Sequence, residues 1–120
     1  MIGVGILGGL LAAILGLLDW LAIPAGTRAK QIGLWHGLGN VLVVVLFIIS
    51  WFLRLPSPST TSAGPIVLSF IAAGIALITG WLGGGLVDRL GIGVYEGANP
   101  NAPSSLSIAQ PSENLRYAGE

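Results

Sequence analysis

The chain has 120 residues, of which 53% are hydrophobic and 8% charged, and its five basic and five acidic side chains give a net charge of zero. Soluble domains carry about 25% charged residues, so this composition suits a lipid environment. A net charge of zero provides no electrostatic attraction for nucleic acid, and the absence of cysteine excludes disulfides, thiolate metal sites and cysteine nucleophiles.

Three apolar segments follow one another along the chain, over 2–23, 33–53 and 65–87. Each has about 20 residues or more, which is the length that an α-helix needs to cross a hydrocarbon core roughly 30 Å thick. We therefore predict transmembrane helices over about 2–23 and 31–54, and a third that begins at Pro65 and ends between Gly83 and Arg89. The first segment lacks a basic leader and is too long for the apolar core of a signal peptide, so we interpret it as a retained helix.

The expected fold class is all-α: an integral membrane bundle of three transmembrane helices over residues 1–90, followed by an extended tail over 91–120. The tail is rich in Pro, Ser, Asn and Gly and has too few apolar residues to fold by itself. We predict that it contacts a partner surface on the cytoplasmic side through Tyr95, Leu106, Ile108, Leu115 and Tyr117.

The basic residues near the predicted helix ends are unevenly distributed. Arg28, Lys30 and Arg89 fall on one side of the membrane, whereas Arg54 falls on the other. Cytoplasmic loops carry the excess of Lys and Arg, so the N-terminus is expected outside and the tail in the cytoplasm. Tryptophans near both ends of the predicted helices agree with interfacial aromatic belts.

Small residues recur at four-residue spacing in each predicted helix. Such residues let helix backbones approach closely, within one bundle or against another subunit. The residues concerned are Gly8, Ala12 and Gly16 in the first helix, Gly33 and Gly37 in the second, and Ala72, Ala76, Gly80 and Gly84 in the third.

A few polar side chains are predicted to gather at one end of the bundle. They are Asp19, His36, Asn40, Asp88 and Arg89. Ionisable groups at this depth usually face the bundle interior and find partners. One interpretation is a cofactor or quinone contact, or a proton relay through His36. The other is structural, with hydrogen bonds that satisfy buried polar groups.

Catalytic and metal sites are not predicted. The sequence has no nucleophile–base pair, no His-x-x-x-His, no paired acidic motif and no phosphate-binding loop. A single histidine cannot supply both axial ligands of a haem, although His36 could be one axial ligand of a haem or pigment covered by a partner. We therefore expect no enzymatic activity and no cofactor held by this chain alone; a pigment, haem, quinone or lipid at a subunit boundary is the alternative.

Three motifs resemble a known family of small bacterial membrane proteins, domain-of-unknown-function family 2231. They are AAILGLLDWLAIPAG at 12–26, WHGLGN at 35–40 and GWLGGGLVDRLGIGV at 80–94. The resemblance covers about residues 5–94 and implies a multi-helix protein of the bacterial inner membrane, sometimes found near electron-transfer proteins, with no established activity. Members of the family usually begin with a further helix that carries a histidine-proline motif, and nothing before Ile2 matches it. That departure favours a helper subunit.

The function predicted from these observations is that of a non-catalytic accessory or scaffold subunit. It would belong to a larger bacterial membrane complex, of photosynthetic or respiratory electron transfer, and its partners would be other membrane subunits and lipid. The alternative is an electron-transfer module, or a module that binds a pigment or haem, with His36 as the single axial ligand.

Overall fold

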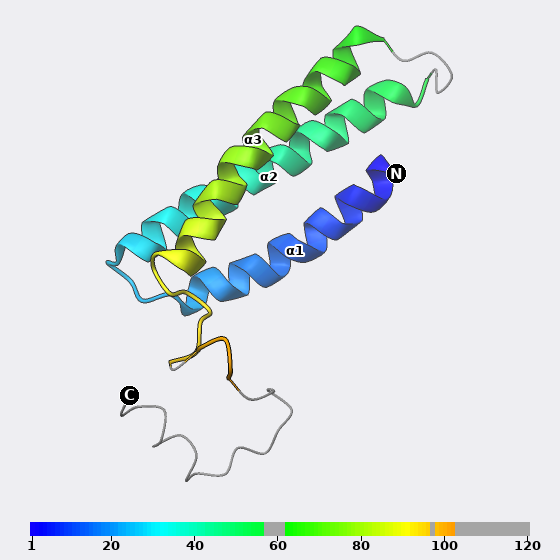
Figure 1. The fold of residues 1–120 in the computed structure, drawn as a ribbon. Coiled ribbons are helices and arrows are strands. Elements are labelled where there is room, and N and C mark those ends of the chain that lie inside the picture. The colour runs from blue at the N-terminus through cyan, green and yellow to red at the C-terminus, as the bar shows by residue number, and fades with distance from the viewer. Residues whose placement is uncertain (57–61, 97, 103–120) are drawn as a thin grey trace.

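The computed structural model describes residues 1–56, 62–96 and 98–102. Within them, α1 spans Ile2–Ala22, α2 spans Arg28–Arg54 and α3 spans Ala63–Asp88 (Figure 1). Each helix is long and apolar enough to cross a membrane, and the described residues contain no strand. The predicted all-α bundle of three membrane spans is therefore confirmed. The predicted tail anchors Leu106, Ile108, Leu115 and Tyr117 lie outside the described residues.

Local signals in the sequence explain where the helices begin and end. The hydroxyl of Thr27 accepts a hydrogen bond from the backbone N–H of Lys30 at 3.2 Å, so α2 begins slightly earlier than its apolar segment. Pro65 lies in the first turn of α3, where its missing N–H costs no helical hydrogen bond. After α3, the chain turns at Gly91, which has a φ of +63° and donates to the carbonyl of Val87 at 3.1 Å.

The central element is α2. It contacts both other helices, whereas the backbones of α1 and α3 make no close contact with each other (Figure 1). The approach of α1 to α2 depends on glycine: a Cβ added to Gly9 would lie 2.9 Å from a methyl carbon of Val44, and one added to Gly33 would lie 3.0 Å from Cδ1 of Trp20. Glycines at these contacts let the two backbones come close enough for dispersion contacts between the helices.

The apolar core lies at the end of the bundle where α1 leads into α2. Ile23, Ala29 and Leu86 are buried there against one another. Partly buried apolar side chains from all three segments surround this core, namely Trp20, Ile32, Leu90 and Ile92. Two of the three motifs that resemble the family, at 12–26 and 80–94, therefore meet at this core, because they supply Ile23 and Leu86 respectively.

Lys30 ties the end of α1 to the start of α2. Its ammonium donates hydrogen bonds to the carbonyls of Trp20, Leu21 and Ile23, the last at 3.0 Å, and lies 4.1 Å from the centroid of the Trp20 ring. The indole N–H of Trp20 donates in return to the carbonyl of Lys30 at 3.0 Å. A cation at a helix C-terminus also interacts favourably with the helix dipole. This one side chain therefore satisfies carbonyls that α1 leaves without helical partners.

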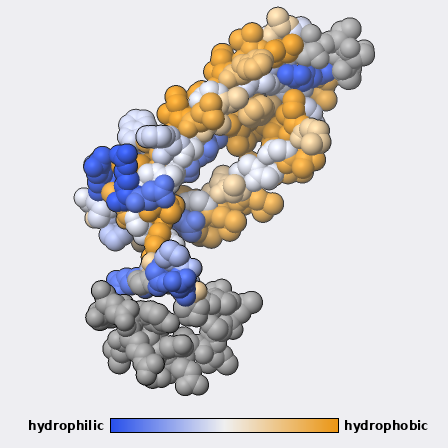
Figure 2. Space-filling view, viewed as in Figure 1, coloured by the Kyte–Doolittle hydropathy of each residue, from blue (hydrophilic) through white to orange (hydrophobic). Residues whose placement is uncertain are grey.

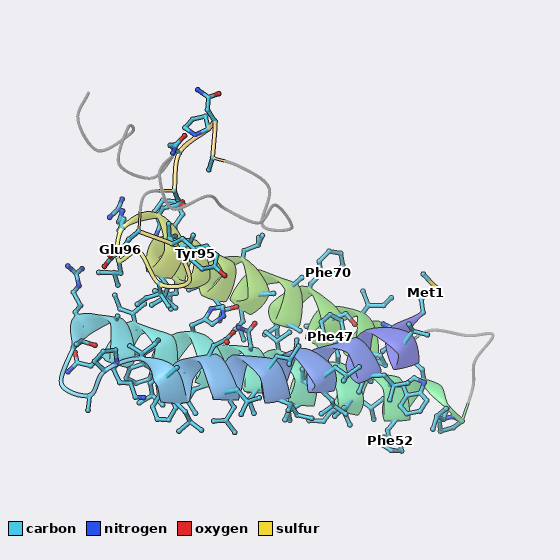
Figure 3. All side chains as sticks on the ribbon, turned by 90° about the horizontal axis from the view of Figure 1, so that it is seen from below. Met1, Phe47, Phe52, Phe70, Tyr95 and Glu96 are labelled. Atoms are coloured by element: carbon cyan, nitrogen blue, oxygen red, sulfur yellow. The ribbon has the colours of Figure 1, made fainter. Side chains whose placement is uncertain are left out.

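Large apolar side chains cover the outside of the bundle. Figure 2 shows hydrophobic surface over much of the visible face of the helices. Phe52 and Phe70 point away from the bundle on opposite sides, and Phe70 is 75% exposed (Figure 3). An apolar exterior of this kind is stable only in contact with lipid or with other apolar helices.

Replacement of Lys30 with Met should weaken the joint between α1 and α2. The variant keeps an apolar stem but loses the donors to three carbonyls, so we expect a loss of about 1 kcal/mol in stability. Unfolding in a neutral detergent, followed by tryptophan fluorescence, measures the change. The control is Arg28→Met, which removes the same charge from the same turn of α2 without removing a side-chain hydrogen bond found among the described residues. Equal stability of the two variants would show that Lys30 does not tie the helices.

Candidate functional site

A polar network crosses the contact between α2 and α3. Nδ1 of His36 lies 2.7 Å from the backbone carbonyl of Thr79. Because a carbonyl only accepts, this contact places the ring proton on Nδ1 and leaves Nε2 as an acceptor in the neutral ring. The side-chain amide of Asn40 lies 3.2 Å from Nε2 and can donate to it. Both nitrogens of the His36 ring therefore have hydrogen-bonding partners within the chain.

Asn40 and Thr79 complete this network. The Asn40 amide also donates to the backbone carbonyl of His36 at 2.9 Å, and its oxygen accepts from the hydroxyl of Thr79 at 3.1 Å. Thr79 is only 4% exposed, and among the described residues no buried side-chain nitrogen or oxygen lacks a partner. We call these three residues the His36–Asn40–Thr79 network. The polar groups of its side chains all have hydrogen-bonding partners, so the network avoids the free-energy cost of unpaired polar groups in an apolar setting.

Two glycines make room for the network. A Cβ added to Gly83 would lie 2.7 Å from Cε1 of His36, and one added to Gly39 would overlap the methyl group of Thr79. Neither glycine belongs to the predicted small-residue faces. Of those predicted residues, Gly33 packs on Trp20 and Ala72 is completely buried within the bundle. A Cβ added to any of Gly8, Gly16, Gly37, Gly80 or Gly84 would meet no atom within 4 Å.

The predicted polar cluster separates into three parts. His36 and Asn40 come together as predicted from their spacing, and their third partner is Thr79. Asp88 and Arg89 instead line a surface hollow with Arg28, between the start of α2 and the end of α3. Asp19 is exposed on α1 and makes no hydrogen bond or ion pair with any residue that the structure describes.

A second polar network at the opposite end was not predicted. Ser50, which is completely buried, donates to the carbonyl of Pro65 at 2.8 Å and lies 3.0 Å from the hydroxyl of Ser69. The guanidinium of Arg54 donates to the same carbonyl at 3.1 Å and to Ser69 at 3.2 Å. The spacing of Ser50 and Arg54, four residues apart on one helix face, is the signal that could have identified this network.

The hydrogen bonds within these networks limit the chemistry that their side chains can perform. The Thr79 hydroxyl bonds to Asn40 and to the carbonyl of Ala76, so it is not paired with the imidazole as a nucleophile would be with its base. An axial bond from Nε2 of His36 to a metal would replace the hydrogen bond from Asn40. In this arrangement the network joins α2 to α3 through hydrogen bonds.

Replacement of Gly83 with Ala should destabilise the bundle, because the added methyl group collides with the His36 ring. Overpacking of this kind costs about 1–3 kcal/mol. The matched control is Gly84→Ala in the same run of glycines, where the methyl group meets nothing and helix propensity favours alanine by up to about 1 kcal/mol. Unfolding by increasing fractions of a denaturing detergent compares the two. A Gly83→Ala variant as stable as Gly84→Ala would show that the helices do not meet at this position.

Comparison with known proteins identifies a family. The family model described as "Predicted membrane protein (DUF2231)" matches residues 1–96, a range that contains all three helices and both polar networks. No curated protein and no solved structure matches the chain. The family predicted from the three motifs is confirmed: the chain belongs to the DUF2231 family of predicted membrane proteins.

Proposed function

We propose that this protein is a non-catalytic accessory subunit, which assembles with other transmembrane helices in a larger complex of the bacterial inner membrane. The observation that carries the proposal is the uncovered small-residue face of α1. Gly8, Ala12 and Gly16 lie at four-residue spacing on α1, all three are exposed, and α1 contacts α2 alone.

A glycine face on a helix is stabilised by a neighbouring helix and not by lipid. A glycine inside a helix costs about 1 kcal/mol relative to alanine. Lipid chains pack as well against leucine as against glycine, so a face that meets only lipid gains nothing from Gly8 and Gly16. Another helix can approach such a face closely and gain dispersion contacts along its length. The family resemblance suggests a photosynthetic or respiratory electron-transfer complex as the place to search for the partner.

The distribution of charge supports an orientation for this subunit. Arg28 and Lys30 lie in the first turn of α2, and Arg89 directly follows α3, so these three basic residues share one side of the membrane. Arg54 lies at the other end of α2. By the positive-inside rule, the N-terminus is outside and the segment after α3 is in the cytoplasm.

Enlargement of the α1 face should prevent assembly. In a double variant with Gly8→Leu and Gly16→Leu, the leucines would hold a neighbouring helix away, and we expect at least a tenfold loss of co-purified partner subunits from detergent-solubilised membranes. The matched control carries Gly8→Ala and Gly16→Ala, which removes the same glycines but keeps the face small. If the leucine variant retains its partners as well as the alanine variant does, the α1 face is not the interface.

The orientation can be tested directly because the chain has no cysteine. Ser62 precedes α3 and makes no capping hydrogen bond, and Glu96 is exposed beyond the other end of α3. A membrane-impermeant maleimide applied to intact cells should label Ser62→Cys and spare Glu96→Cys, with both labelled after the membrane is opened. The opposite labelling pattern would show that the N-terminus is in the cytoplasm and the proposed orientation is wrong.

A further inference from the structure

A hollow with a volume of about 530 Å³ opens on the surface between the first turns of α2 and the last turns of α3. Its lining is polar at one end and apolar at the other. Arg28, Asp88 and Arg89 form the polar part, while Trp81 lines the hollow together with Gly80 and Gly84, which have no side chains. Figure 2 shows hydrophilic side chains beside apolar surface toward this end of the bundle.

The two arginines of the hollow are available to a ligand. Neither the Arg28 nor the Arg89 guanidinium makes a hydrogen bond or an ion pair with any residue that the structure describes, and both residues are exposed. With Asp88 included, the polar part of the lining has a net charge of +1. The positive end of the α2 dipole lies here as well, because α2 begins at Arg28. The opposing negative end of α3 is covered, since its carbonyls at Leu86 and Val87 accept from Ile92 and Gly91.

The apolar part of the hollow extends along α3 into its membrane-spanning length. Gly80 and Gly84 leave space beside the α3 backbone, and the Trp81 side chain is 76% exposed. Tryptophan rings favour the depth of lipid headgroups, and basic pockets between transmembrane helices are places where anionic headgroups bind. The hollow thus places positive charge at the water boundary directly above a space for an apolar chain.

We propose that this hollow binds an anionic phospholipid. The phosphodiester contacts Arg28 and Arg89, and an acyl chain lies over Gly80 and Gly84. An apolar helix could fill the apolar part, but it would leave the net charge of +1 uncompensated. A single phosphodiester supplies the missing negative charge, and the lipid chain fills the remainder. The proposal is independent of the subunit assignment, because it concerns a different face of the molecule from Gly8 and Gly16 of α1.

Native mass spectrometry of the full chain in a neutral detergent tests the site, with titration of three probes: phosphatidylglycerol, phosphatidylcholine with the same acyl chains, and soluble glycerol phosphate. We expect phosphatidylglycerol to bind at least tenfold more tightly than phosphatidylcholine, and glycerol phosphate not to compete with it. Removal of a basic residue near a membrane surface weakens binding about fivefold, so the double variant with Arg28→Gln and Arg89→Gln should lose most of the preference.

A charge control and a variant that fills the apolar part of the hollow complete the test. Asp19→Asn changes the charge by one unit at an exposed residue that does not line the hollow, and should leave the preference for phosphatidylglycerol within twofold of the original. Gly84→Leu fills the apolar part and should lower binding of phosphatidylglycerol. Equal affinities for the two lipids, an unchanged preference in the double arginine variant, or equally tight binding of glycerol phosphate would each overturn the proposal. Dimers of the chain that Gly84→Leu dissociates and phosphatidylglycerol does not would assign the hollow to a helix.

Discussion

The bundle depends on how closely α3 can approach α2 at Gly39 and Gly83. A bilayer provides no hydrophobic force between apolar helices, so their association must come from close packing and from polar groups that bond across the contact. Gly39 makes room for Thr79, and Gly83 makes room for the His36 ring. The approach places Nδ1 of His36 2.7 Å from the Thr79 carbonyl, and the remaining bonds of the His36–Asn40–Thr79 network require that same separation.

The two neighbours of α2 are held in different ways. Toward α3, polar networks lie near both ends of the contact, with His36 at one end and Ser50 at the other, so sliding or rotation of α3 would break hydrogen bonds in an apolar setting. Toward α1, the tie is the Lys30 ammonium at one end, together with glycine contacts along the helices. Because α1 contacts α2 alone, most of its surface stays uncovered, and that surface includes the face that we assign to a partner.

Hydropathy and length were sufficient to predict the three spans. In a bilayer, a single long apolar segment can pair its backbone N–H and C=O groups internally only as a helix, whatever its neighbours are. The four-residue spacing of His36 and Asn40 was also sufficient to place them on one helix face, since that spacing follows from helix geometry alone. The family followed from three motifs, two of which meet at the joint around Ile23 and Leu86.

The sequence determined which elements form and which side chains share a helix face, because both depend only on local geometry and on the solvent. The tertiary structure alone decided which face of each helix meets another. The small residues Gly80 and Gly84 predicted that their face of α3 packs closely against a helix. The neighbouring face, with Thr79 and Gly83, is the one that approaches α2. The predicted depth in the membrane likewise grouped Asp19 with His36, although Asp19 is exposed on α1 while His36 contacts Thr79 of α3. Rotation of a helix about its own axis leaves hydropathy and depth unchanged, so only contacts between helices can determine it.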